Sequence, residues 1–311
     1  MNASTGASAL PTRSRRLLIS GLLLAGTGAI AASGKAVIVK LAYRHGADAT
    51  TLLALRMLIA FPFFIAMGLW AARRTQPLSW GDRGRVVLLG FSGYYLSSYL
   101  DFLGLQYISA TLERLILYLS PTLVVLIALV VLKHKPTRTQ VAALLVSYLG
   151  VLLAFGHDIQ LEGQRTLIGS ALVFASALSY AVYLFGSGQA VARIGAVRLT
   201  AYASMVACVL CIGQYLLLQP WSGLWSQARP VYGLSLINGT VCTVLPVLAI
   251  MIGVKRIGSS LAAQVSMLGP VSTIVLSVWL LDEPMGLWQS AGTVLVLLGV
   301  LLVGSGAAKR R

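Results

Sequence analysis

The sequence predicts an all-α integral membrane protein of ten transmembrane helices, arranged as two inverted five-helix repeats. Its 311 residues are 58% hydrophobic and 10% charged, whereas about 25% of the residues in an average soluble domain are charged. Apolar runs of about 20 residues, each long enough to span a membrane as a helix, recur along the whole chain. Segments of alternating polarity, which would indicate a transmembrane barrel, are not found. An internal repeat, described below, completes the prediction.

The predicted elements follow the apolar runs in chain order. Residues 1–16 are expected to form a disordered cytoplasmic N-terminus. The first run then continues to about Tyr43, which is too long for a cleaved signal peptide, so it is expected to remain as a helix. The ten predicted helices cover residues 17–43, 51–72, 84–107, 109–132, 138–156, 166–188, 197–218, 230–253, 259–281 and 286–306.

Basic residues set the predicted orientation. Lys and Arg concentrate in cytoplasmic loops of membrane proteins. With both termini inside, the inner loops would hold Arg13, Arg15, Arg16, Arg73, Arg74, Arg83, Arg85, Lys133, Lys135, Arg138, Arg193, Arg198, Lys255, Arg256, Lys309, Arg310 and Arg311. The outer ends would hold Lys40, Arg44, Arg165 and Arg229. This bias favours a multi-pass protein of the cell (inner) membrane with both termini in the cytoplasm.

The two halves of the chain match at a fixed offset. Subtracting 121 from 270, the positions of two prolines within apolar runs, gives an offset of 149. The same offset relates Gly104 to Gly253, Leu119 to Leu268, Arg44 to Arg193, Gly46 to Gly195, Thr51 to Thr200, and LGVLL at 149–153 to LGVLL at 298–302. The predicted repeats are residues 17–156 and 166–306. Five spans per repeat invert the second copy, which is typical of transporters with a site near mid-membrane.

Three segments carry a resemblance to a known family. They are ALRMLIAFPFF from position 54, GLQYISATLERLILYLSPTLVVLIALVVLKHKPT from position 104, and IGSSLAAQVSMLGPVSTIVLSVWLLDEPMGLWQSAGTVLVLLGVLLV from position 257. The chain resembles the EamA-type, ten-helix members of the drug/metabolite transporter superfamily over about residues 17–306. The first repeat departs from the pattern because His134 stands where the second has Glu283. The resemblance implies secondary transport, often export of metabolites or amino acids, through a cavity lined by both halves.

Other function classes find little support. The net charge of +16 lies mostly in short groups between apolar runs, so nucleic-acid binding is not expected. Cys208, Cys211 and Cys242 lie within apolar runs without a second cysteine pair or a histidine partner, so no metal or other cofactor is expected. The chain has no GxxxxGK[ST] loop and no constellation of a soluble enzyme, which argues against ATP hydrolysis and catalysis.

Ionisable residues at membrane depth are the candidate site. At 1.5 Å per residue, Lys35, Arg56, Asp101, Glu113 and Arg114 lie roughly 6–12 Å below the outer ends of four predicted helices. Charge at this depth is costly and therefore suggests function. We expect one buried cluster, in which Glu113 and Arg114 face different neighbours because adjacent helical residues point about 100° apart.

Two interpretations of this cluster remain open. In the functional one, Lys35 or Arg56 meets an anionic group of the substrate, and Asp101 or Glu113 carries a proton or binds an amine. In the structural one, the five form ion pairs that hold helices together, such as Arg56 with an acid. The other candidate site residues are Tyr99, Tyr118, Tyr183 and Gln264, with Asn238 and Thr243 as neutral hydrogen-bonding groups of the second repeat.

Proline and acidic residues at helix interruptions complete the predictions. Pro121 and Pro270 are related by the repeat and are candidate hinges for gating. Asp282 and Glu283, at the outer end of the ninth helix, are expected to form a solvated cap. The stripe of Gly21, Ala25, Gly28 and Ala32 predicts a close-packing helix face.

The predicted function is therefore secondary transport by alternating access. The expected task is export of small organic metabolites or amino acids, with a proton gradient as a candidate driving force. The alternatives are a multidrug-type efflux carrier and a membrane enzyme acting on lipid-linked substrates. The expected partners are a small organic solute and the lipid bilayer, with a homodimer as a candidate assembly and no nucleic acid.

Overall fold

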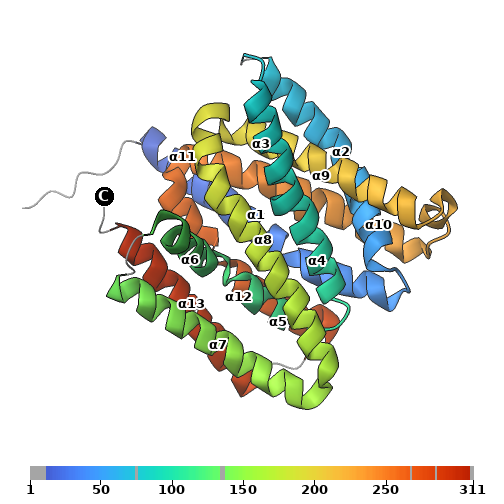
Figure 1. Cartoon of the computed structure of the whole chain (residues 1–311), viewed down its shortest axis with the longest axis vertical. Helices are drawn as coiled ribbons and strands as arrows, with labels where there is room; N and C mark the ends of the chain where they lie inside the picture. Colours follow the sequence, from blue (N-terminus) through green and yellow to red (C-terminus); the bar gives the residue numbers. More distant parts are fainter. Residues whose placement is uncertain (1–11, 74–75, 134–136, 267, 284–285, 309–311) are drawn as a thin grey trace, which may run out of the picture.

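A computed structural model describes residues 12–73, 76–133, 137–266, 268–283 and 286–308 as a bundle of helices (Figure 1). The first repeat comprises α1 (Thr12–Arg44), α2 (Ala49–Ala72), α3 (Trp80–Gly90), the π-helical turn η1 (Phe91–Leu96), α4 (Ser97–Gly104), α5 (Ala110–Leu117), α6 (Ser120–Leu132) and α7 (Arg138–Glu162). The second comprises α8 (Gln164–Ile194), α9 (Ala196–Leu218), the 3-10 turn η2 (Trp221–Leu224), α10 (Arg229–Gly239), the π-helical turn η3 (Thr240–Val244), α11 (Leu245–Ser266), α12 (Leu268–Leu281) and α13 (Leu287–Ala308).

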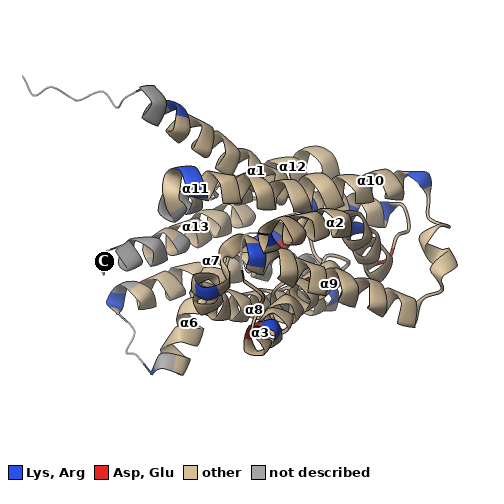
Figure 2. Cartoon of the chain, turned by 90° about the horizontal axis from the view of Figure 1, so that it is seen from above, with Lys and Arg blue, Asp and Glu red and all other residues tan. Residues whose placement is uncertain are grey.

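The described part of the chain contains ten apolar helical segments, in agreement with the ten predicted spans. Seven stretches of the described chain are long and apolar enough to span a membrane, and Gln140–Ala154, Leu268–Leu281 and Leu287–Gly299 are shorter apolar helices. The first segment begins earlier than expected, because α1 is already helical at Thr12. Figure 2 shows a ribbon that is tan over most of its length, with isolated blue and red segments, as expected for helices surrounded by lipid.

In each repeat, the third helical segment packs against the first helix of the other repeat. The segment formed by α10, η3 and α11 packs on α1, and its counterpart formed by α3, η1 and α4 packs on α8. The second segments of the repeats, α2 and α9, pack on each other, and so do the last segments, α7 and α13. Because equivalent contacts recur with the repeats exchanged, the bundle consists of two inverted copies.

Irregular backbone positions follow the same offset. The π-helical turn at 91–96 corresponds to the one at 240–244. Gly46 and Gly195 both have positive φ, of 83° and 87°, and Lys133 and Asp282 are both left-handed, with φ of 52° and 57°. These pairs show that the duplication extends to the backbone kinks and turns.

Close helix contacts also occur twice. A Cβ atom on Gly150 would lie 2.7 Å from the Gly292 carbonyl oxygen, and one on Gly299 would lie 2.9 Å from that of Ala143, so the absence of a side chain at these glycines lets α7 and α13 approach closely. The predicted small-residue stripe on α1 is confirmed as a packing face, since Gly21 lies against Ile257 and Gly28 against Ile250.

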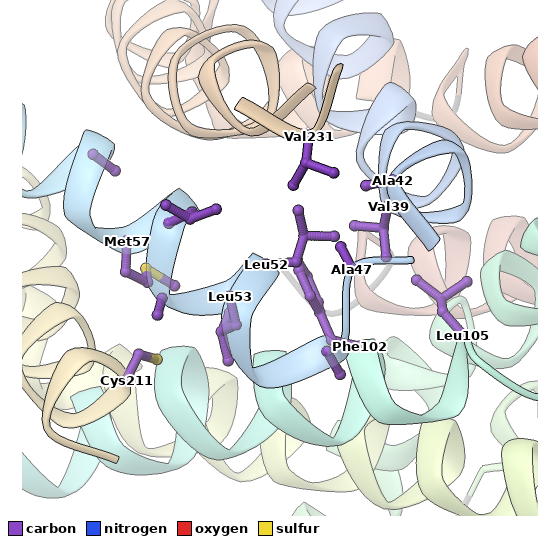
Figure 3. Packing of buried hydrophobic residues seen from close by; sticks show 14 of the residues in the cluster. Val39, Ala42, Ala47, Leu52, Leu53, Met57, Phe102, Leu105, Cys211 and Val231 are labelled. Atoms are coloured by element: carbon purple, nitrogen blue, oxygen red, sulfur yellow. The ribbon is translucent and has the colours of Figure 1, made fainter. Parts of the chain in front are cut away.

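The two ends of the bundle differ in packing. We call the end with the first turn of α1 and the last turns of α13 the termini side, and the end with segments 45–48, 105–109, 219–228 and 282–283 the loop side. The largest apolar core lies on the loop side, where Leu52, Leu53, Phe102, Leu105 and Val231 come together from three segments of both repeats (Figure 3). The loop side is therefore closed by continuous apolar packing.

Candidate functional site

Lys35 forms ion pairs with two acids from different helices. Its Nζ lies 2.5 Å from Oδ2 of Asp101 on α4 and 3.5 Å from Oε1 of Glu113 on α5. Both acids are fully buried, with 1% and 0% of their surface exposed. One ammonium group on α1 thus joins three helices of the first repeat. Removing it would leave two carboxylates buried without this cation, which is strongly unfavourable.

Arg114 completes a neutral set of four charges. Its Nε lies 3.9 Å from Oε2 of Glu113, and its Nη2 donates to the backbone oxygen of Ser33 at 3.3 Å. The prediction that Glu113 and Arg114 face different neighbours was wrong, since both side chains reach α1. Their long stems allow this despite the 100° difference in direction. We call Lys35, Asp101, Glu113 and Arg114 the charge cluster.

Arg56 does not share in the ion pairs of this cluster. Its Nε donates a 2.8 Å hydrogen bond to Oγ1 of Thr243, and its guanidinium carbon lies 5.3 Å from the centroid of the Phe102 ring. It is 8% exposed, and its Nη1 has no hydrogen-bond partner among the described residues. The pairing of Arg56 with Asp101 or Glu113, which the structural interpretation offers as an example, is absent from the ion pairs of the described chain. The five ionisable residues therefore divide into a paired group of four and a separate cation.

Arg56 lines a cavity between the two repeats. The cavity has a volume of about 370 Å³ and lies between α1, α2, η1, α8, α9 and the segment from η3 into α11. The described residues that line it are Ala32, Arg56, Met57, Phe64, Tyr94, Tyr180, Thr200, Ser204, Ala207, Cys242, Thr243, Pro246, Val247, Ile250 and Met251. Among them, Arg56 carries the single permanent charge.

The position of this central cavity follows from the helix directions. Tyr94 lies near the middle of its segment and Arg56 about two turns into α2 from the loop side, whereas Thr200 is in the first turns of α9 and Met251 is well along α11, both toward the termini side. The cavity thus runs from mid-bundle toward the termini side, and its loop-side end is closed by the apolar core around Phe102. Arg56 lies at this closed end.

The two π-helical turns meet at the cavity. Tyr94 belongs to η1 and Thr243 to η3, and the offset of 149 makes them equivalent. A π-helical turn inserts a residue into the helix and changes the direction of the side chains near it, and such turns are frequent at functional sites. Thr243 also donates to the backbone oxygen of Asn238 at 2.7 Å, within the distorted turn, and so fixes its hydroxyl beside Arg56.

The tyrosines occupy different places from those predicted. Tyr94 and Tyr180 line the cavity. Tyr183 lies behind them, with its hydroxyl 3.2 Å from that of Tyr94. Tyr99 stacks on Tyr95, with ring centroids 6.4 Å apart. None of the predicted trio of Tyr99, Tyr118 and Tyr183 is among the described residues lining this cavity.

The remaining predicted site residues lie elsewhere. The hydroxyl of Tyr118 packs against Gly269, where an added Cβ would be 2.8 Å away. Gln264 lies in α11, and its side chain is outside the described residues. Asn238 is fully buried, and both polar atoms of its side chain lack a partner among the described residues.

Pro121, the first of the two predicted hinge prolines, begins the second half of an interrupted helix. Pro121 stands in the first turn of α6, directly after the break at Tyr118 and Leu119 that separates it from α5. Pro270 lies in α12, which the structure describes from Leu268 onward. Proline fits a first turn because it lacks the N–H that would be unsatisfied there. Their role as hinges remains a prediction.

Glu283 is not a solvated cap as expected. Its Oε1 accepts a 2.8 Å hydrogen bond from the N–H of Ala110, and its Oε2 accepts from the N–H and the hydroxyl of Thr111 at 3.2 and 3.0 Å. A carboxylate of the second repeat thus caps the N-terminus of α5 in the first, where the helix dipole favours negative charge. This contact ties the repeats together on the loop side.

The sequence profile of the EamA-like transporter family matches this chain twice, over residues 19–156 and 167–305. The chain belongs to the EamA-like transporter family. It thereby falls within the drug/metabolite transporter superfamily, as the resemblance predicted. The two matched segments correspond to the halves that meet at the central cavity.

Relatives of this EamA-like transporter agree with that assignment. It is 32% identical to the uncharacterized transporter YcbK of Bacillus subtilis, over 85% of this chain and 86% of that protein. It is 29% identical to the uncharacterized transporter YyaM of the same species, over 69% and 71%. A solved crystal structure that is 20% identical covers 91% of this chain and 98% of its own, with a TM-score of 0.62, and shows the same fold.

The sequence did contain a signal for the cavity residues of this transporter that were missed. Glycines at the offset of 149, Gly90 and Gly239, immediately precede the two π-helical turns. The same offset relates Tyr94 to Thr243, and this relation would have marked both as candidate site residues. That Tyr94 and Thr243 lie at the same cavity, however, depends on how the two repeats pack against each other.

Proposed function

We propose that this transporter is a secondary carrier that exports small organic solutes bearing an anionic group, such as carboxylic acids or amino acids. The proposal rests on Arg56, a buried cation at the closed end of the central cavity. Its Nη1 has no hydrogen-bond partner among the described residues. A buried charge without an ionic partner is unfavourable. A carboxylate of the solute would supply that partner through charge-assisted hydrogen bonds.

The rest of the cavity suits an amphipathic molecule. Tyr94, Tyr180, Thr200 and Ser204 offer hydroxyl groups, while Met57, Phe64, Val247, Ile250 and Met251 offer apolar surface. A volume of about 370 Å³ falls within the range of roughly 300–1,000 Å³ typical of small-molecule sites. The solute would lie with its anionic group on Arg56 and its apolar part toward the termini side.

The direction of the cavity supports export. The distribution of Lys and Arg favours a cytoplasmic termini side, and the cavity runs toward that side. In this conformation the transporter would load solute from the cytoplasmic side of the inner membrane. Release would require the loop side to open, which means separating the core around Phe102 and the Glu283 contact.

The charge cluster is the candidate for proton coupling. Asp101 and Glu113 share Lys35, so a proton arriving on one acid would change the pairing of the other. The charge cluster joins α1, α4 and α5. Two of these elements are linked to the cavity, because α1 lines it directly and η1, which precedes α4, lines it through Tyr94. Protonation would therefore loosen contacts of helices that line the solute site.

Counterflow in proteoliposomes tests the carrier proposal. Vesicles containing the purified protein are loaded with unlabelled amino acids and short carboxylic acids, and uptake of each labelled counterpart is followed. A carrier accumulates label transiently by exchange, and Arg56→Gln should abolish that signal for anionic solutes. A channel or an enzyme acting on lipid-linked substrates gives no transient accumulation, and that result would refute the proposal.

A further inference from the structure

A second cavity lies at the termini side between α2, α3 and α9. It has a volume of about 720 Å³ and is lined mostly by apolar side chains, together with Arg83 and Arg198. We call it the lateral groove. We propose that the lateral groove binds one anionic phospholipid of the leaflet on the termini side, with its phosphate on the two arginines and an acyl chain along the apolar wall.

The length of the groove matches one leaflet. Arg83 lies in the first turn of α3 and Arg198 in the first turn of α9, so both are at the termini side of the bundle. The apolar wall extends along α9 to Leu210. The rise from Arg198 to Leu210 is about 18 Å at 1.5 Å per residue, close to half of a hydrocarbon core of about 30 Å.

The groove faces outward from the bundle. Val87 on α3 and Val209 on α9 line it, and they are 52% and 57% exposed. In a membrane-spanning helix such apolar surface contacts lipid. An acyl chain therefore reaches this wall directly from the bilayer, without entering the central cavity.

The two arginines provide the charge that a lipid phosphate would meet. Arg198 is 8% exposed, its Nη1 donates to the Gln76 carbonyl oxygen at 2.8 Å, and its guanidinium carbon lies 5.5 Å from the centroid of the Tyr202 ring. These contacts fix the guanidinium in place, yet its buried Nε has no partner in the described part of the chain. Arg83 lies over Trp80 at 4.7 Å.

Asp82 does not form an ion pair with either arginine among the described residues. Asp82 lies beside Arg83 in sequence, but its carboxylate pairs with Arg85 at 3.7 Å and with Arg193 at 3.4 Å. No ion pair of the described residues involves Arg83 or Arg198. Their charges are therefore available to an anion, and a basic pocket between helices on the cytoplasmic side is the kind of site that binds anionic head groups.

The test measures lipid binding to the delipidated full-length protein in detergent. Dioleoyl phosphatidylglycerol and dioleoyl phosphatidylcholine are titrated separately, and bound lipid is counted by native mass spectrometry. We expect phosphatidylglycerol to bind with one tight site. Arg83→Gln and Arg198→Gln should each weaken that site about five-fold, the effect of roughly 1 kcal/mol per basic residue.

Two further variants make the result specific. Val209→Trp fills the apolar wall without changing charge, so it should remove the tight site even if Arg198→Gln fails to fold. Arg256→Gln removes an exposed termini-side charge from α11, outside the groove, and should leave binding unchanged. Equal binding of the two lipids, or unchanged phosphatidylglycerol binding in Arg83→Gln and Val209→Trp, would overturn the proposal. Transport is not measured, so the outcome is independent of the proposed function.

Discussion

Arg56 of the first repeat is held by Thr243 of the second, through a 2.8 Å hydrogen bond from its Nε to the threonine hydroxyl. Arg56 is equivalent to Met205 by the repeat, and Thr243 to Tyr94, so this contact has no symmetric counterpart. The duplicated scaffold thus contains one asymmetric cation at its centre. The predictions begin from this pair.

Replacing Arg56 should remove binding of anionic solutes. A hydrogen bond to a charged group contributes about 1.5–3 kcal/mol, so Arg56→Gln should weaken solute binding by roughly ten- to a hundred-fold. Binding is measured by isothermal titration with the solute that counterflow identifies. Arg165→Gln, at an exposed position on the loop side, is the matched control. Equal affinity of the Arg56 variant and the control would show that Arg56 does not contact solute.

Removing the Thr243 hydroxyl should have a smaller effect of the same kind. Thr243→Val leaves Arg56 in place but frees its Nε, so the guanidinium loses its fixed direction. We expect solute affinity to fall about five-fold, as for the loss of one neutral hydrogen bond of about 1 kcal/mol. Thr240→Val in the same π-helical turn is the control, because the Thr240 hydroxyl donates to Leu236 and is exposed. A larger loss in the Thr240 variant would contradict this assignment.

Glu113→Gln should abolish coupled transport while leaving membrane insertion intact. An amide cannot release a proton, and Glu113 is one of the two buried acids that share Lys35. The measurement is solute-driven proton movement in proteoliposomes, with Asp82→Asn as the control at an exposed ion pair. If Glu113→Gln transports at the normal rate, this acid is not the proton carrier.

Lys35→Met should destabilise the protein, because it leaves Asp101 and Glu113 without their shared cation. Breaking a buried ion pair costs about 3–5 kcal/mol, which thermal unfolding in detergent would report as a large fall in Tm. Adding Asp101→Asn should recover part of the loss, since Glu113 keeps Arg114 at 3.9 Å. Lys255→Met on α11 is an exposed control. No recovery in the double variant would mean that Asp101 and Lys35 are not coupled.

Glu283→Gln should favour opening of the loop side. Its carboxylate caps α5 across the repeat boundary, and loss of such a cap costs about 0.5–2 kcal/mol. Spin labels at Gln106→Cys and Gln219→Cys, both exposed on the loop side, would report a longer distance in a larger fraction of molecules. The three native cysteines are buried and should label little. Asp282→Asn, which leaves the cap intact, should show the original distances.

The orientation of the protein can be checked at Lys133, at the termini side end of α6. A cysteine introduced there should react with a membrane-impermeant maleimide from the cytoplasm alone. A cysteine at Gln219 should react from the opposite side. Labelling of the Lys133 position from outside would reverse the orientation and, with it, the direction of loading from the central cavity.

Local patterns were sufficient for the helices and for the repeat. The apolar runs predicted ten spans because a membrane imposes a length and a composition on every helix independently of its neighbours. The offset between Pro121 and Pro270 predicted the inverted halves because an odd span count fixes the direction of the second copy. Depth along each helix brought Lys35, Asp101 and Glu113 to one level, and the structure does place them in contact.

Rotation about each helix axis could not be predicted in the same way. Sequence spacing predicts the depth of Arg56 but not its direction and therefore places it with the acids, whereas packing turns it toward Thr243. The same limit applies to Glu283, whose partners Ala110 and Thr111 are far away in sequence. Partners of a long side chain depend on which helix faces it.

By itself, the sequence determined the membrane-spanning fold, the duplication and the presence of costly buried charges, because each follows from transfer of local segments into lipid. Only the tertiary structure decided that four of those charges neutralise one another and that Arg56 lines a separate cavity with Tyr94 and Thr243. The physical reason is that electrostatic pairing depends on distances of a few ångströms between helices, which the packing of the two repeats sets.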